Sequence, residues 1–134
     1  MEQIIKQNVL TAQEFEMLFR SVGWDAPSQE QITLALQHSI VTFSAYSGDT
    51  LIGMARLIGD YGMTWYLKDL AVSTQAQKSG AGTALMKAVE DYILSTIQPG
   101  WAVSLELISS KGKEPFLSAS GCRHAPMNGT AAAC

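Results

Sequence analysis

Residues 70–86 carry the residue types of an anion-binding loop. Apolar residues end there in a polar segment with two glycines, Gly80 and Gly82, and a long amphipathic helix is predicted to follow. A helix N-terminus presents unpaired N–H groups and a partial positive charge, and glycine lets the backbone approach an anion closely. Together with the charge of Lys78, these features predict a phosphate or pyrophosphate site. A glycine-rich helix start that serves only close packing is the alternative, because such a glycine pair is a weak motif.

Two common phosphate-binding motifs do not fit this segment. A P-loop needs Lys followed by Ser or Thr directly after its last glycine, whereas Gly82 is followed by Thr83-Ala84. The dinucleotide-binding motif needs a glycine or alanine three residues after its second glycine, and Leu85 stands there. The sequence therefore favours an anion site of another type.

Two helices are predicted before the loop and one after it. Thr11 and Glu14 predict a capping box at the start of the first helix, which Gly23 ends, and Ser28 begins the second. The helix after the loop ends at Pro99-Gly100. Its buried face is predicted by an apolar stripe at i, i+4 spacing, formed by Leu85, Val89, Ile93 and Ile97.

Strands are predicted where β-branched and aromatic residues gather between turn residues, at 4–5, 40–46, 51–59, 63–72 and 101–108. A short helix at 114–120 and a last strand or irregular tail from 121 complete the chain. The order is β-α-α-β-β-β-α-β-(α)-(β), which predicts an α/β (α+β) class with a mixed sheet and helices on its faces. No repeat or linker divides the sequence, so we expect a single domain over residues 1–134.

The composition excludes several classes of function. The chain has 134 residues, 47% of them hydrophobic, and a net charge of -3, so it is neither a disordered protein nor a general nucleic-acid binder. No apolar run approaches the roughly 18 residues of a membrane span. Cys122 and Cys134 lack metal-site spacing. We therefore expect no metal, no nucleic acid and no membrane partner, and a cytoplasmic location without a signal peptide.

Gln77-Lys78-Ser79-Gly80-Ala81-Gly82 matches the Gln/Arg-x-x-Gly-x-Gly/Ala signature of the GNAT superfamily of N-acetyltransferases, which the chain resembles. The resemblance extends to 21–24, 53–60, 68–72 and 112–116, as in small bacterial-type members, and covers most of the chain to about Phe116. The C-terminal part, from about Leu117, is divergent. The predicted order of elements, obtained from the residue patterns, agrees with the GNAT fold.

This resemblance implies an enzyme that moves an acetyl group from acetyl-CoA to a primary amine of a small molecule or a protein. In such enzymes the strand end offers backbone groups to the pantetheine arm, and the loop cradles the pyrophosphate, with Thr83 capping the helix. A backbone N–H near Leu70, at a strand bulge, polarises the acetyl carbonyl. A homodimer is also expected from the family. The implied cofactor-binding residues are Leu70, Ala71, Val72, Gln77, Lys78, Ser79, Gly80, Ala81, Gly82 and Thr83.

Two carboxylates are candidates for the catalytic base that takes the proton of the amine. Asp69 precedes the pantetheine-binding segment and Glu106 lies on the neighbouring predicted strand, and either could act directly or through water. The alternatives are a structural hydrogen bond for Asp69 and a solvated strand face for Glu106.

Other side chains have two possible roles each. For Arg56, a contact with a substrate carboxylate and a structural ion pair are equally compatible with the sequence. Trp24 and Trp65 are expected in the core rather than in an acceptor cleft.

The sequence departs from the family at the proton donor for the departing thiolate. Many members have a Tyr after Phe at the position of Phe116-Leu117, and Leu117 has no proton to give. Three functions therefore stay open: an active N-acetyltransferase, a catalytically weak or inactive acetyl-CoA-binding relative, and a domain that binds another anion or a partner. Binding of acetyl-CoA separates the third function from the first two.

Overall fold

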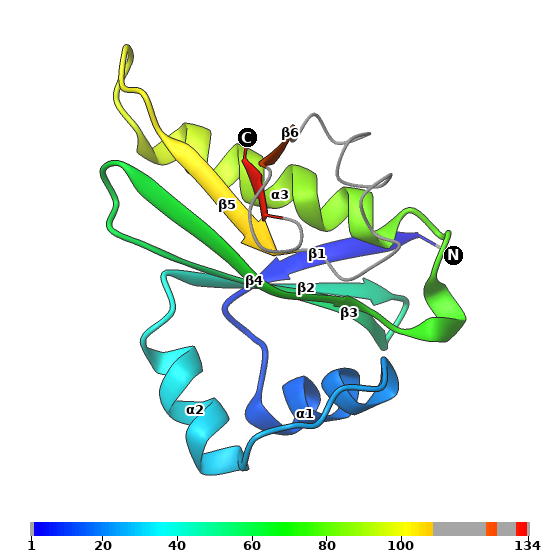
Figure 1. Cartoon of the computed structure of the whole chain (residues 1–134). Helices are drawn as coiled ribbons and strands as arrows, with labels where there is room; N and C mark the ends of the chain where they lie inside the picture. The colour runs from blue at the N-terminus through cyan, green and yellow to red at the C-terminus, as the bar shows by residue number, and fades with distance from the viewer. Residues whose placement is uncertain (1, 109–122, 126–130, 134) are drawn as a thin grey trace.

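The computed structural model of the chain describes residues 2–108, 123–125 and 131–133. Within them, seven strands form one sheet in the order β1-β2-β3-β4-β5-β7-β6. Helices α1 and α2 lie on one face of the sheet and α3 lies on the other, as Figure 1 shows. The elements are β1 Gln3–Gln7, α1 Ala12–Ser21, α2 Gln29–Gln37, β2 Val41–Ser47, β3 Thr50–Gly59, β4 Thr64–Val72, η1 Thr74–Ala76, α3 Ala81–Thr96, β5 Ser104–Ile108, β6 Arg123–Ala125 and β7 Ala131–Ala133.

The sheet is mixed, with one parallel pair of strands. Strands β1, β2, β3 and β4 pair antiparallel in sequence, and β7 pairs antiparallel with both β5 and β6. β4 and β5 are parallel, which requires the crossover that α3 supplies. The predicted fold class is confirmed, and the predicted order of elements is confirmed as far as β5.

The C-terminal region differs from the sequence prediction. β5 begins at Ser104 rather than at residue 101, because the Trp101 N–H donates to the Gln98 carbonyl at 3.2 Å and prolongs the turn after α3. Where one last strand or a tail was expected from residue 121, the structure has two short strands, β6 and β7. The helix predicted at 114–120 and the divergent Leu117 lie outside the described residues.

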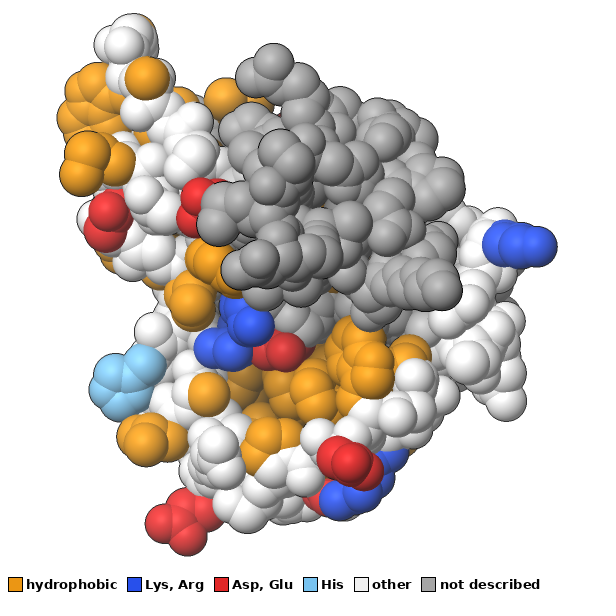
Figure 2. Space-filling view, viewed as in Figure 1, with side chains coloured by type: hydrophobic (Ala, Val, Ile, Leu, Met, Phe, Trp, Pro, Cys, Tyr) orange, Lys and Arg blue, Asp and Glu red, His pale blue; other side chains and the backbone are white. Residues whose placement is uncertain are grey.

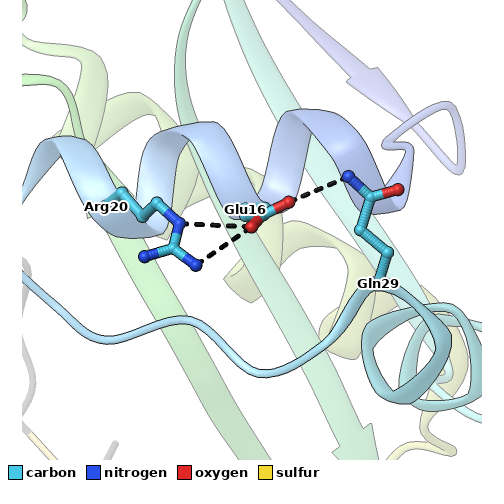
Figure 3. A network of polar contacts seen from close by, with 3 residues as sticks. All are labelled: Glu16, Arg20 and Gln29. Atoms are coloured by element: carbon cyan, nitrogen blue, oxygen red, sulfur yellow. Dashed lines mark hydrogen bonds and ion pairs between the residues drawn. The ribbon is translucent and has the colours of Figure 1, made fainter.

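Local hydrogen bonds fix the start of α1 and join it to α2. The predicted capping box is present: the Glu14 N–H donates to Thr11 Oγ1 at 3.1 Å, and the Thr11 N–H donates to Glu14 Oε1 at 3.0 Å. Figure 3 shows Glu16 of α1 between Arg20 and Gln29, the first residue of α2. Glu16 accepts hydrogen bonds from Gln29 Nε2 at 2.8 Å and from Arg20 Nε at 3.1 Å, which lower the pKa of Glu16.

Apolar side chains form a core on each face of the sheet. Between the sheet and α3, Trp65 is fully buried together with the predicted α3 stripe at Leu85, Val89 and Ile93. The expectation of a core position is confirmed for Trp65, whereas Trp24 is partly buried and packs against the second cluster. On the α1–α2 face this cluster is built from Leu10, Phe15, Leu18, Ile32, Met54 and Ala71.

The β3–β4 turn is built around Asp60. Its Oδ1 accepts hydrogen bonds from the backbone N–H groups of Gly62, Met63 and Thr64 at 2.9, 2.8 and 3.0 Å. Hydrogen bonds to a carboxylate favour its charged form, so the N–H groups of Thr64, Gly62 and Met63 lower the pKa of Asp60. The turn is therefore stabilised most when Asp60 is ionised.

Asp60→Asn is expected to lower the Tm at neutral pH and to have less effect in acid. The lowered pKa means that the carboxylate contributes stability above the unfolded Asp pKa of about 3.9, and that this contribution is lost as the pH falls through the folded pKa. The difference in Tm between wild type and variant should therefore shrink below about pH 4. Calorimetry across this range measures it, with Asp49→Asn in the exposed β2–β3 turn as control. A pH-independent difference would contradict the prediction.

Candidate functional site

Among the described residues, the second half of β4 is paired with another strand on one side only, and its other side is called the free edge. β4 pairs with β5 only over residues 64–67, whereas its pairing with β3 continues to Val72. The Ser73 N–H donates to the Ile52 carbonyl of β3 at 2.8 Å. Because the backbone groups of successive strand residues point to alternate edges, those of Val72 and Leu70 point away from β3. In the described ranges no strand pairs with this edge, and the Val72 carbonyl there accepts a hydrogen bond from Gln77 Nε2 at 3.3 Å. The Leu70 backbone groups and the Val72 N–H are the groups that this edge offers to a ligand.

A β-bulge lies at the start of this free edge. β3 advances two residues, from Met54 to Arg56, where β4 advances three, so that Asp69 and Leu70 together lie opposite Ala55. Asp69 has a φ of +58°, in the left-handed region that costs an L-residue about 1–2 kcal/mol and that Asp tolerates better than most residues. The bulge expected near Leu70 is therefore present.

The loop after β4 leads into a helix N-terminus whose N-cap residue has no side chain to cap it. After the short turn η1, α3 begins at Ala81, with Gly80 as its N-cap and no side-chain hydrogen bond from that residue. Lys78 and Gly80 are both left-handed, with φ of +69° and +92°. The Ala81 N–H donates to Ser79 Oγ at 3.4 Å, and the Ser79 N–H donates to the Ala76 carbonyl at 3.2 Å. Left-handed residues before a helix start turn successive N–H groups toward one point, which is the geometry of an anion site.

Thr83 does not cap α3, which corrects the role that the resemblance implied for it. Thr83 is the third residue of the helix, because the left-handed Gly80 turns the chain into the helix two residues before Gly82. Gln77 Nε2 donates to the Val72 carbonyl at 3.3 Å and so joins the loop to the strand. The structure gathers the other expected cofactor-binding residues in two places, with Lys78, Ser79, Gly80, Ala81 and Gly82 at the start of α3 and Leu70, Ala71 and Val72 on β4.

Gly53 lets the first turns of α3 approach the sheet. It lies on β3 opposite Val72, at the level of the free edge. A Cβ at Gly53 would lie 3.0 Å from Leu85 Cδ1 of α3 and 3.2 Å from the Ala71 carbonyl oxygen. The missing side chain therefore sets the close spacing between the N-terminal part of α3 and the end of β4.

Gly53→Val is expected to lower the free energy of unfolding by about 1–3 kcal/mol, because its added methyl groups overpack this contact. Urea denaturation measures the change. Gly53→Ala adds only the Cβ and should have the smaller effect, since the Leu85 side chain can shift by a few tenths of an ångström. A Gly53→Val protein as stable as wild type would show that α3 does not depend on this glycine.

Arg56 and Asp69 form an ion pair beside the bulge. Arg56 Nε lies 2.8 Å from Asp69 Oδ2, and the two side chains are only 16% and 14% exposed. Arg56 Nη1 donates to Ser39 Oγ at 3.3 Å, and Ser39 Oγ donates to the Ala35 carbonyl in the last turn of α2 at 2.8 Å. The structural ion pair considered for Arg56 is thus present, and it engages one carboxylate oxygen of Asp69.

Glu106 is an exposed carboxylate on the strand next to this pair. In the parallel register of β4 and β5 it lies beside Tyr66. Trp65 faces the α3 core, so Tyr66 and Glu106 lie on the α1–α2 face of the sheet. Arg56 lies on that face as well, because Met54, two residues before it, packs there. Glu106 and the Arg56–Asp69 pair therefore share one face.

A cavity of about 600 Å³ lies between α1 and the loop after β4. Ser73, Gln75, Ala76 and Ser79 of the loop line it, and Gln3 of β1 lines it and donates to the Ser79 carbonyl at 3.2 Å. Figure 2 shows hydrophobic side chains gathered in a hollow between the α1–α2 layer and the sheet, with a basic and an acidic side chain at its rim. In the part of the chain that the structure describes, no charged side chain lines the cavity itself.

The described residues hold no group of three or more His, Cys, Asp or Glu side chains that could bind a metal ion. In the same ranges, no helix is long and apolar enough to cross a bilayer.

Comparison with known proteins gives consistent matches. The sequence profile of the acetyltransferase (GNAT) family matches residues 9–98. An uncharacterised N-acetyltransferase of Prochlorococcus marinus, described as ycf52-like, is 28% identical over 112 residues, which is 81% of this chain and 60% of that protein. The chain thus spans 60% of the length of this curated relative.

Solved structures show the same fold. A GNAT family acetyltransferase of Streptococcus pneumoniae superposes with a TM-score of 0.73 at 27% identity, over 90% of this chain and 86% of that one. An N-acetylglutamate synthase of Neisseria gonorrhoeae, solved with coenzyme A and L-arginine, superposes with a TM-score of 0.75 at 18% identity, over 98% of this chain and 32% of that one. At that identity the second likeness shows the fold alone.

Proposed function

The chain belongs to the GNAT family of acetyltransferases, and we propose that it transfers an acetyl group from acetyl-CoA to a primary amine of a small molecule or a protein. One observation carries this proposal: among the described residues, the β4 edge that no strand covers is followed, after η1 and a short loop, by the N-terminus of α3, whose N-cap Gly80 supplies no side-chain hydrogen bond. An extended arm that carries backbone-like amides and ends in a pyrophosphate is complementary to that combination. The coenzyme A bound to the synthase of the same fold supports the assignment.

The residues of the chain fit the parts of acetyl-CoA. Leu70 and Val72 direct backbone donors and acceptors toward the pantetheine amides, as an added strand would require. The N–H groups of Lys78, Gly80 and Gly82 would hold the pyrophosphate, because those of Ser79 and Ala81 already donate to the Ala76 carbonyl and to Ser79 Oγ, and the Lys78 ammonium group would add charge. The neutral polar and apolar cavity beside the loop offers no counter-charge among its described lining residues, so it suits an uncharged part of a ligand.

The protein must stabilise the charge on the acetyl oxygen, remove a proton from the amine and hold the two substrates together. Acetyl-CoA supplies the thioester, whose carbonyl carbon forms the new C–N bond with the amine while the C–S bond breaks and the thiolate leaves. We assign to the Leu70 N–H at the bulge the role of donating to the acetyl oxygen, where negative charge develops. We assign to Glu106 the role of taking the amine proton, directly or through water, because Arg56 holds one carboxylate oxygen of the other candidate, Asp69. Holding both substrates together supplies much of the remaining acceleration.

Other parts of the expected function stay predictions. The acceptor amine, pairing as a homodimer and a cytoplasmic location rest on the family resemblance and the composition. The proton donor for the thiolate also stays open, because Leu117 lies outside the described residues. A catalytically weak acetyl-CoA-binding relative is therefore the second candidate function, favoured by the absence of Tyr at this position in the sequence.

Calorimetric titration with acetyl-CoA and with CoA tests the proposal first. A ligand that binds only the folded state must also raise the Tm, which gives an independent readout. We expect micromolar binding of both compounds, followed by release of free thiol from acetyl-CoA in the presence of a suitable amine. Binding without release of thiol across a broad amine panel would favour the second candidate. Absence of binding by a folded sample would overturn both.

A further inference from the structure

An ion pair at the bulge joins three elements around the site. Arg56 comes from β3, Asp69 from the bulge of β4, and Ser39 from the end of α2. The Nε–Oδ2 distance is 2.8 Å and both charged side chains are more than four-fifths buried. A pair with this exposure is screened by solvent far less than the pair of Arg20 and Glu16 on α1, where Arg20 is 57% exposed.

The bulge needs something to hold it. Asp69 is a non-glycine residue in the left-handed region, and such residues persist where the surrounding structure over-determines them. The hydrogen bond from Arg56 fixes the Asp69 side chain. Because the side chain is attached to the backbone, this contact also favours the left-handed backbone conformation of Asp69. Ser39 fixes the guanidinium group in turn, because Ser39 Oγ accepts from Arg56 and donates to the Ala35 carbonyl.

The direction of one N–H group depends on that backbone conformation. Leu70 follows Asp69 directly, so the peptide plane that carries the Leu70 N–H is set by the ψ of Asp69. With the bulge in place, this N–H points away from β3 toward the free edge of β4. Without the bulge, the pairing register between β3 and β4 would shift at Asp69 and Arg56. The Leu70 N–H would then no longer point toward the free edge of β4.

We propose that Arg56 is a positioning residue for acetyl transfer, which through Asp69 holds the β4 bulge so that the Leu70 N–H points at the acetyl oxygen of bound acetyl-CoA. This inference rests on the proposed function. Arg56 touches neither the thioester nor the amine in this arrangement. Its effect should therefore appear in the recognition of the acetyl group and not in the binding of the rest of coenzyme A.

Titration of Arg56→Gln with acetyl-CoA and with CoA separates these two effects. We expect the CoA affinity to stay within about twofold of wild type, while the preference for acetyl-CoA over CoA falls about fivefold, as for the loss of one hydrogen bond. The carbonyl stretching frequency of bound carbon-13-labelled acetyl-CoA should rise, because a hydrogen bond lowers it. In a turning-over enzyme, kcat should fall about tenfold or more while the KM for acetyl-CoA changes little.

Three further variants keep the test interpretable. Arg56→Lys retains a charge that can reach Asp69 and should recover part of the preference for acetyl-CoA. Asp69→Gly removes the ion pair but can still adopt the left-handed conformation, so its loss of preference should be smaller than that of Asp69→Ala. Arg20→Gln breaks the exposed pair on α1 and should match wild type in every readout.

The outcomes distinguish the inference from the function on which it rests. If wild type binds both compounds and a folded Arg56→Gln keeps the wild-type preference and carbonyl frequency, the inference is wrong although the proposed function stands. If Arg56→Gln does not fold, unchanged values in Arg56→Lys and Asp69→Ala lead to the same conclusion. If wild type binds neither acetyl-CoA nor CoA, the proposed function fails and this inference fails with it.

Discussion

Gly80→Val should weaken coenzyme A binding by about 100-fold or more, the equivalent of losing two charge-assisted hydrogen bonds. Gly80 is the N-cap of α3 and has a φ of +92°, which a β-branched residue does not adopt without strain. The backbone of the variant would relieve that strain by rotating the neighbouring peptide planes. The N–H groups proposed to bind the pyrophosphate would then no longer point in the same direction. Calorimetric titration with CoA measures the loss.

The steric surroundings of Gly80 make the loss specific. A Cβ at Gly80 would meet nothing within 4 Å, so the variant adds no clash to the core. Gly100, just beyond the other end of α3, has a φ of +87° and equally open surroundings. Gly100→Val therefore imposes the same backbone strain away from the loop and should bind CoA like wild type. Equal affinities of wild type and Gly80→Val would remove the pyrophosphate site from the start of α3.

Features that depend on neighbours in the sequence could be predicted from the sequence. The capping box of Thr11 and Glu14 and the buried stripe that includes Leu85 need only residues within one or two turns of a helix. The start of α3 was predictable for the same reason, since Gly80 directly precedes the helix, and the anion site there stays a prediction. These local signals were enough to predict a mixed sheet and the order of helices and strands along the chain as far as β5.

Features that depend on the register between distant residues could not be derived in this way. The Arg56–Asp69 pair needs the pairing of β3 with β4 and the extra residue of the bulge, so the sequence left ion pair and substrate contact equally open for Arg56. The helix begins after Gly80 and not after Gly82 because Gly80 is the glycine that adopts the left-handed conformation. The sequence does not show which of the two glycines does so. β7 is formed by three alanines with little strand propensity, and its pairing with β5 determines it.

Trp65→Ala should lower the free energy of unfolding by about 3–5 kcal/mol, the range for truncating a fully buried aromatic residue. Trp65 is 0% exposed and packs in the core that the sheet shares with α3. It pairs with Gly59 of β3 and with Leu105 of β5, so it lies where β4 is paired on both sides, before its edge becomes free. For a chain of this size the change corresponds to a fall in Tm of about 10 °C or more. Calorimetry or urea denaturation measures it.

Two comparisons tie this loss to the buried ring. Trp101 is 50% exposed, so Trp101→Ala should change the stability by no more than about 0.5 kcal/mol. Trp65→Phe keeps an aromatic ring and removes the Trp65 Nε1–H, which has no hydrogen-bond partner among the described residues. Removing an unpaired buried donor recovers about 1–3 kcal/mol and offsets part of the lost packing, so Trp65→Phe should lose less than half as much as Trp65→Ala. Equal losses in Trp65→Ala and Trp101→Ala would mean that this part of β4 does not depend on the Trp65 ring.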